Sequence, residues 1–237
     1  MADTSVKAQT ANRHSFVRAM LVSLGILGIS FFLNSYRIAE TVDLKSDEAT
    51  YAIESVSLVR TGMTKWNGGS FLVHPPLFYM VEGAYYNALG IGYGTLFDRL
   101  IGRGYTAGEP LLPANATLSG TSMLYAIVAG RYLVALYGAI ITVLVFLLGS
   151  TLVNWRLGAF GAALLMLDPY AIWRNHFNYL EPLATLLGVL MILVYYRAVN
   201  NTYERYRNRY LLLTGLFFGL SLLTKELALI YFPPLLV

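Results

Sequence analysis

The chain has 237 residues, of which 57% are apolar and 13% are charged. Soluble domains hold about 45–50% apolar and about 25% charged residues, so the composition is typical of a membrane protein. The net charge of +4 does not indicate a nucleic-acid partner, because the basic residues stand in short segments between apolar runs. Because cysteine is absent, a disulfide framework, a thiol nucleophile and a thiolate metal site are excluded.

The first apolar run, at residues 17–33, follows the basic residues Lys7, Arg13 and Arg18. A cleavable signal peptide has a shorter apolar core, of about 7–15 residues, and a small-residue cleavage site. Neither feature is found here. We therefore predict a retained membrane span, with residues 1–15 as a cytoplasmic tail.

Further apolar runs predict an all-α polytopic membrane protein. The candidate spans lie at residues 132–153, 157–170, 182–196 and 210–224, and a last run at 227–237 begins another. Counting the first span, we expect about six transmembrane helices. Residues 35–130 form an outer loop and residues 131–237 a helical bundle. Since the last run stops without a polar tail, we expect the sequence to be the front part of a longer chain.

Basic residues in the short loops predict the orientation of the chain. Arg156 lies in the turn after the second span, and the linker at residues 197–209 contains four arginines. Loops rich in Lys and Arg stay in the cytoplasm. With the N-terminus inside, both loops fall on the inner side, and residues 35–130 fall on the outer side.

Two amphipathic helices are predicted in the outer loop. The first, at residues 46–60, carries one apolar stripe at helical spacing: Ala49, Ala52, Ile53, Val56 and Val59. The second lies at residues 77–91, where another crossing would turn the arginine-rich linker outward, so we predict a helix along the membrane interface. Pro75 and Pro76 must turn the chain before it. Residues 92–122 are predicted to be an outer loop.

Ionisable residues gather near the predicted outer boundary. They are Asp47, Glu48, His74, Arg131, Asp168, Arg174, His176, Glu181 and Lys225. Charges beside membrane spans are costly and usually mark a substrate or ion pathway. Carboxylates can deprotonate a hydroxyl, and Lys and Arg can hold a phosphate. Singly, each residue also has a structural explanation, such as a first-turn acid for Asp47 or a headgroup anchor for Arg131.

The order of these residues resembles the protein O-mannosyltransferase and aminoarabinose transferase group. The matching positions are Asp47-Glu48, Tyr51, Thr61-Gly62, His74-Pro75-Pro76-Leu77, Gly130-Arg131-Tyr132-Leu133, Leu148-Gly149, Asp168-Pro169, Arg174, Leu180-Glu181, Gly219-Leu220 and Leu223-Thr224-Lys225. Members of this group are GT-C glycosyltransferases that take sugars from polyprenyl-phosphate carriers. The resemblance extends over nearly the whole chain and implies a GT-C-like fold.

The resemblance implies roles for individual residues. Asp47 is expected to be the catalytic base, with Glu48 and Glu181 as companion acids. The residues expected near the donor phosphate are His74, Arg131, Arg174 and Lys225. The implied reaction is an inverting sugar transfer to a protein, lipid or glycan acceptor on the periplasmic, extracellular or lumenal side. No cofactor is firmly implied, although a divalent metal between Asp47 and Glu181 stays an alternative.

Two other functions remain open at the level of sequence. A truncated or non-catalytic relative would serve as a structural subunit of a larger membrane complex. A transporter would use the outer charges as a gate, but it would also need ionisable residues on the inner side of the spans, where few are found. The partners expected for the enzyme are membrane lipid, the polyprenyl-phosphate sugar and its acceptor.

Overall fold

The computed structural model describes residues 2–40, 45–66, 69–70, 74–91 and 123–226. This part of the chain is helical apart from one short antiparallel pair, formed by β1 (Lys65–Trp66) and β2 (Gly69–Ser70). The all-α expectation is therefore confirmed for the described residues, although this small hairpin was not predicted. The predicted loop at residues 92–122 and the last apolar run at 227–237 lie outside the described residues.

Among the residues that the structure describes, three helical segments are long and apolar enough to cross a membrane: Val17–Glu40, Met123–Leu152 and Glu181–Val199. They contain the apolar parts of α1 (Ala2–Ser35), α5 (Met123–Leu152) and α8 (Glu181–Val199). Segments of this kind fit an integral membrane protein.

The expected number of about six spans is not confirmed in the described part of the chain. Helix α6 (Trp155–Leu167) would extend only about 20 Å at 1.5 Å per residue, less than the hydrocarbon thickness of about 30 Å. Helix α9 (Glu204–Leu222) carries three arginines in its first two turns, which shortens its apolar stretch.

Two helix boundaries differ from the expectation. Helix α5 begins at Met123 rather than near residue 132, because the helix continues through apolar residues on both sides of Arg131. The run predicted at residues 157–170 is broken at Asp168, whose side chain accepts a hydrogen bond from the Tyr170 N–H at 2.9 Å. This carboxylate caps α7 (Pro169–Asn175), and Pro169 fits the first helical position because its missing N–H is not needed there.

The two helices predicted in the outer loop are both found. They are α2 (Ser46–Thr61) and α3 (Leu77–Ala88), which begins directly after Pro76. Ala52, Ile53 and Val56 of the predicted stripe are buried, whereas Val59 is 40% exposed, so the buried face ends one turn before the helix does. At Gly83 of α3, a side chain would collide with the backbone of α2, and this explains how closely the two helices pack.

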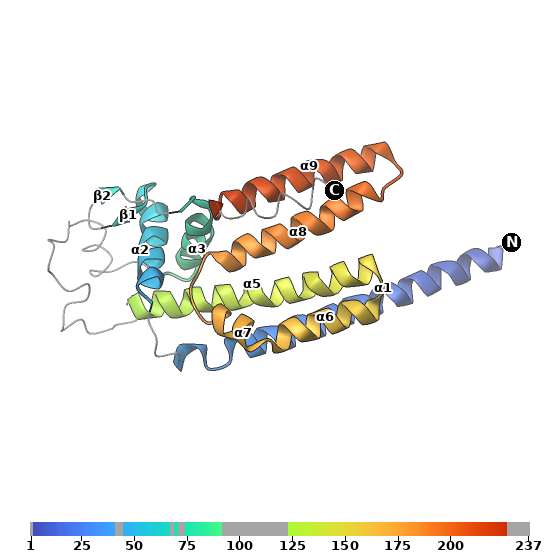
Figure 1. The fold of residues 1–237 in the computed structure, drawn as a ribbon, viewed down its shortest axis with the longest axis horizontal. Coiled ribbons are helices and arrows are strands. Elements are labelled where there is room, and N and C mark those ends of the chain that lie inside the picture. Colours follow the sequence, from blue (N-terminus) through green and yellow to red (C-terminus); the bar gives the residue numbers. More distant parts are fainter. Residues whose placement is uncertain (1, 41–44, 67–68, 71–73, 92–122, 227–237) are drawn as a thin grey trace.

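The helices form an elongated bundle with a distinct layer at one end (Figure 1). Helices α1, α5, α6, α8 and α9 run roughly along the long axis, while α2 lies across the axis at one end, next to α3. A hydrophobic core joins the two parts, with Tyr51 of α2, Phe78 of α3, Val134 of α5 and Leu183 of α8 among its residues. The turns between α5 and α6 and between α8 and α9 lie at the opposite end.

Candidate functional site

Three charged side chains from separate segments meet near the end of the bundle that carries α2 and α3. Glu181, the first residue of α8, accepts a hydrogen bond from Nζ of Lys225 at 2.6 Å. The same carboxylate oxygen lies 2.9 Å from a guanidinium nitrogen of Arg174, in the last turn of α7. All three side chains are partly exposed. Because two cations share one carboxylate, this ion cluster carries a net positive charge.

The local sequence explains how the ion cluster forms. Glu181 stands in the first turn of α8, where the helix dipole favours a carboxylate, and the following Pro182 needs no hydrogen-bond partner there. Lys225 comes near because α9 packs along α8, with Ser221 Oγ donating a hydrogen bond to the Ala184 carbonyl at 3.0 Å. The packing of two helices therefore brings residues far apart in sequence into one ion cluster.

Arg174 is held by an aromatic ring as well as by Glu181. Its guanidinium lies over the ring of Tyr179, 4.4 Å from the ring centroid, at a distance suited to a cation–π contact. Tyr179 belongs to the short connection between α7 and α8. The position of that connection thus influences both Arg174 and Glu181.

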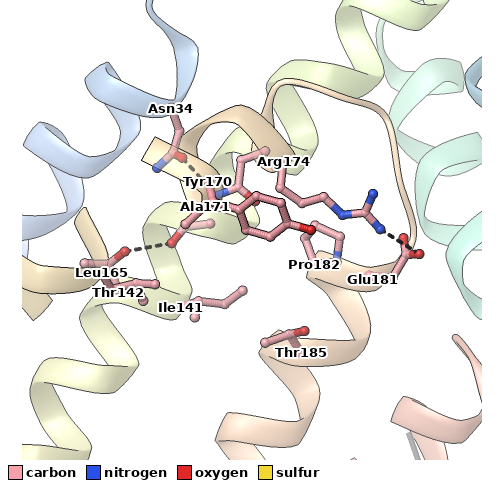
Figure 2. A pocket seen from close by; sticks show the side chains of 12 residues that line it. Asn34, Ile141, Thr142, Leu165, Tyr170, Ala171, Arg174, Glu181, Pro182 and Thr185 are labelled. Carbon is pink, nitrogen blue, oxygen red and sulfur yellow. Dashed lines mark hydrogen bonds and ion pairs between the residues drawn. The ribbon is translucent and has the colours of Figure 1, made fainter. Parts of the chain in front are cut away.

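A cavity of about 270 Å³ lies beside the ion cluster (Figure 2). Arg174 and Glu181 contribute to its lining, and Ile141, Leu165 and Pro182 give it apolar surface. An opening lined by both apolar and charged groups can take an amphipathic ligand, with the charged end of the ligand at the ion cluster.

Amide and hydroxyl groups form another part of the cavity lining. Asn175 Nδ2 donates a hydrogen bond to Asn34 Oδ1 at 2.8 Å, which joins α7 to α1. Behind them, Ser30 Oγ donates to Thr142 Oγ1 at 3.1 Å and joins α1 to α5. These contacts satisfy polar groups inside apolar helices, and they fix three helices around the cavity.

Asp47 lies near the ion cluster without being part of it. It is exposed in the first turn of α2, and Ser46 Oγ makes only a long contact of 3.4 Å to its carboxylate. Burial raises the pKa of the Tyr51 phenol, and the negative charges of Asp47 and Glu181 raise it further. Both carboxylates therefore lie within electrostatic range of the Tyr51 phenol. Among the described residues, Asp47 has no ion-pair partner.

Glu48 and Arg131 form a separate, fully buried ion pair. Arg131 Nε and Nη2 donate to the two oxygens of Glu48, each at 2.8 Å, in the bidentate geometry that Arg favours with carboxylates. The exposed fractions of the two side chains are 1% and 0%. The backbone N–H of Asn178 also donates to Glu48, at 2.7 Å. Both charges are thus enclosed by protein, and their predicted catalytic and phosphate-binding roles stay predictions.

The remaining predicted residues have partners of their own. His74 Nδ1 lies 3.6 Å from a carboxylate oxygen of Glu226, and its ring lies 6.1 Å from that of Tyr51. Lys225 forms its ion pair with Glu181 rather than with its neighbour Glu226. Asp168 caps α7, as described above.

The described residues contain no group of three His, Asp or Glu side chains that could hold a metal ion. Both cations contact Oε1 of Glu181 and its Oε2 has no hydrogen-bond partner, so the alternative of a metal held between Asp47 and Glu181 stays a prediction. We therefore derive no step through a metal.

Two buried acids were missed at the level of sequence. Glu54 of α2 and Glu82 of α3 are both completely buried. Glu54 lies beside the Tyr79 hydroxyl, whereas Glu82 accepts hydrogen bonds from three side chains. The only signal in the sequence was that each predicted amphipathic helix contains an acid. An acid on the solvent-facing side of such a helix would give the same signal.

The segment that holds the ion cluster is similar to a known protein family. A family model described as dolichyl-phosphate-mannose-protein mannosyltransferase matches residues 116–237, just over half of the chain. The chain belongs to this family. No curated protein gives a significant match.

The family predicted from the sequence is thereby confirmed. Membership of the dolichyl-phosphate-mannose-protein mannosyltransferase family places the chain among membrane glycosyltransferases of the mannosyltransferase-like type. The matched segment contains the whole ion cluster of Arg174, Glu181 and Lys225. Asp47, Glu48 and His74 precede the matched segment, so their assignment rests on the sequence pattern and on the geometry described above.

Proposed function

We propose that the protein transfers a sugar from a polyprenyl-phosphate carrier to an acceptor at the membrane surface. Dolichyl-phosphate mannose, which the description of the family names, is the donor that we would test first. The observation that carries the proposal is the ion cluster of Arg174, Glu181 and Lys225, with its net positive charge beside an amphipathic cavity.

The ion cluster is suited to an anionic leaving group. In the proposed reaction the bond between the anomeric carbon and the phosphate oxygen breaks, and the lipid phosphate leaves with an added negative charge. Arg174 and Lys225 would hold that phosphate and stabilise its charge. Glu181 keeps the two cations side by side, which favours a positioning role for it over that of a free base.

Asp47 is the candidate base. Its carboxylate is exposed, so an acceptor hydroxyl can reach it, and both it and Glu181 lie within electrostatic range of the Tyr51 phenol. Asp47 would take the proton of that hydroxyl as the acceptor oxygen attacks the anomeric carbon from the side opposite the phosphate. Attack from that side inverts the configuration of the sugar.

The cavity next to Arg174 would hold the part of the lipid nearest the phosphate. Its apolar lining by Ile141, Leu165 and Pro182 fits a hydrocarbon chain, and its charged lining fits the phosphate. His74 lies near Tyr51 and would contact the acceptor or the sugar rather than the buried ion pair.

The orientation across the membrane is part of the proposal. The N-terminus, the turn with Arg156 and the arginine-rich connection before α9 would lie in the cytoplasm. The ion cluster and Asp47 would then lie at the outer surface. The positions of the loops in Figure 1 support this, since both basic loops lie at the end of the bundle opposite α2 and α3.

Replacement of Asp47 tests the proposed base. Asp47→Asn keeps the shape of the side chain and removes its basicity, so we expect the turnover number for mannose transfer to fall by about 10²–10⁴-fold. The measurement is transfer from radiolabelled dolichyl-phosphate mannose to an acceptor by the purified full-length protein. Glu40→Gln is a matched control, because Glu40 is an exposed acid of the same region that pairs only with Arg37 among the described residues. Full activity of the Asp47→Asn variant would refute the role of Asp47.

A further inference from the structure

Glu82 is a buried acid at the point where α2, α3 and the connection before α8 meet. It accepts hydrogen bonds from Ser55 Oγ of α2 and from the Tyr86 hydroxyl, one turn further along α3, the latter at 2.7 Å. Its Oε1 also accepts a hydrogen bond from Nδ2 of Asn178. The exposed fraction of Glu82 is 0%.

The surroundings of Glu82 supply polar contacts without a positive charge. Its hydrogen-bond donors are two hydroxyls and an amide, and in the described part of the chain it forms no ion pair. Burial raises the pKa of the Glu82 carboxyl to about 7, and the nearby Glu48 carboxylate acts in the same direction. A neutral side chain therefore fits this position if it accepts hydrogen bonds from Asn178 and Tyr86 and also forms a hydrogen bond with Ser55.

Asn178 is held by two acids at once. Its backbone N–H donates to Glu48 at 2.7 Å, and its side-chain amide donates to Glu82. The amide also packs tightly, since a side chain at Gly130 of α5 would come within 2.6 Å of both the Asn178 side chain and the Tyr86 hydroxyl. The connection before α8 is thus fixed at this residue against α2, α3 and α5.

The residues that follow Asn178 lead directly to the ion cluster. Tyr179 carries the ring on which Arg174 lies, and Glu181 begins α8. A shift of Asn178 would therefore move the ring under Arg174 and the carboxylate that holds both cations.

We propose that Glu82 is a positioning residue that, through its hydrogen bond to Asn178, holds the segment from Tyr179 to Glu181 in place for the reaction. This inference rests on the proposed function for its effect on catalysis. Its structural part can be measured without activity. Glu82 does not touch the substrate and acts through Asn178.

Hydrogen exchange of the full-length protein tests the structural part. In Glu82→Ala and in Asn178→Ala we expect the backbone amides of residues 175–181 to exchange about tenfold faster, because each change removes the same buried hydrogen bond. Glu82→Gln should exchange like the wild type, since the amide oxygen accepts from Asn178 and Tyr86 and its NH₂ group donates to Ser55. Thr214→Ala, which removes a hydrogen bond of a buried side chain within α9, is the control and should leave this segment unchanged.

Transfer from dolichyl-phosphate mannose tests the effect on catalysis. We expect kcat/KM to fall about tenfold in each alanine variant, with no further fall in the double variant, because both changes break one contact. Glu82→Gln should restore near-normal values. A general structural role would instead give additive losses and faster exchange throughout the protein.

The proposal is overturned if exchange at residues 175–181 is unchanged in the variants, if Glu82→Gln behaves like Glu82→Ala, or if kcat/KM is unaffected. Should Glu82→Ala not fold, Asn178→Ala decides, because it leaves Glu82 with two of its hydrogen bonds. A wild-type protein without transferase activity would contradict the proposed function. The exchange data would still decide whether Glu82 holds the segment.

Discussion

At the scale of single residues, the buried pair of Glu48 and Arg131 has the largest expected effect on stability. Arg131→Met leaves the Glu48 carboxylate buried without its cation, so we expect a loss of about 3–5 kcal/mol of folding free energy. Thermal or denaturant unfolding of the purified protein measures it. Arg131→Lys keeps the charge but loses the bidentate contact and should give an intermediate loss.

Controls can separate the ion pair from a general effect of removing an arginine. Arg156→Met, at an exposed position of α6, should change stability little. The double variant Arg131→Met/Glu48→Gln should recover part of the loss, because no unpaired charge then remains. If Arg131→Met were as stable as the wild type, the pair would have no structural role.

The different places of Asp47 and Glu48 mark a limit of sequence reasoning at this scale. Both were expected at the site because acids beside a membrane span are costly and usually functional. Neighbouring residues on a helix point about 100° apart, so the two acids have different surroundings, and Asp47 is exposed whereas Glu48 is buried. Which one faces inward depends on where Arg131 of α5 lies, and the sequence does not reveal that. By contrast, Arg174, Glu181 and Lys225 could be assigned to the same end, because the predicted topology places all three there.

At the scale of elements, periodicity predicted the existence of the helices better than their ends. The hydrophobic pattern located α2, α3, α5 and α8, because in each of these helices the same pattern continues over several turns. The start of α5 was missed because Arg131 interrupts its apolar run, although Glu48 of α2 pairs with this arginine. The break between α6 and α7 needs the cap made by Asp168, a local contact that hydropathy does not detect.

The crossing of α5 and α6 gives a prediction at this scale. A side chain at Gly158 would collide with the Phe146 carbonyl oxygen of α5 and with Ser150, and Gly149 and Gly158 face each other across the contact. Gly158→Ala should therefore lower the unfolding temperature. Gly161→Ala is the matched control, because its Cβ would only meet Val145 at an ordinary 3.6 Å. Since alanine is favoured in helices by about 1 kcal/mol over glycine, the control should be neutral or stabilising. Equal effects of the two changes would show that close packing at Gly158 is unimportant.

At the scale of the whole molecule, the basic loops lie at one end of the bundle and a mixed set of acids and cations lies at the other. The turns after α5 and α8, which carry basic residues, lie at one end. The other end holds Asp47, Arg174, Glu181 and Lys225, with α2 and α3 beside them. The sequence predicted this division from loop charges alone, because the rule that places basic loops in the cytoplasm needs only the order of the spans. It could not predict the number of spans in this bundle, because α6 is short and α9 begins with arginines.

The proposed orientation can be measured because the chain has no native cysteine. Met63→Cys places a thiol at an exposed position just after α2, and Tyr203→Cys places one at an exposed position before α9. In intact cells or sealed right-side-out vesicles, a membrane-impermeant maleimide should label the Met63→Cys variant. It should label the Tyr203→Cys variant only after the membrane is permeabilised, because basic residues keep that loop in the cytoplasm. The reverse pattern would place Asp47 and the ion cluster on the cytoplasmic side, and the acceptor would then have to be a cytoplasmic molecule.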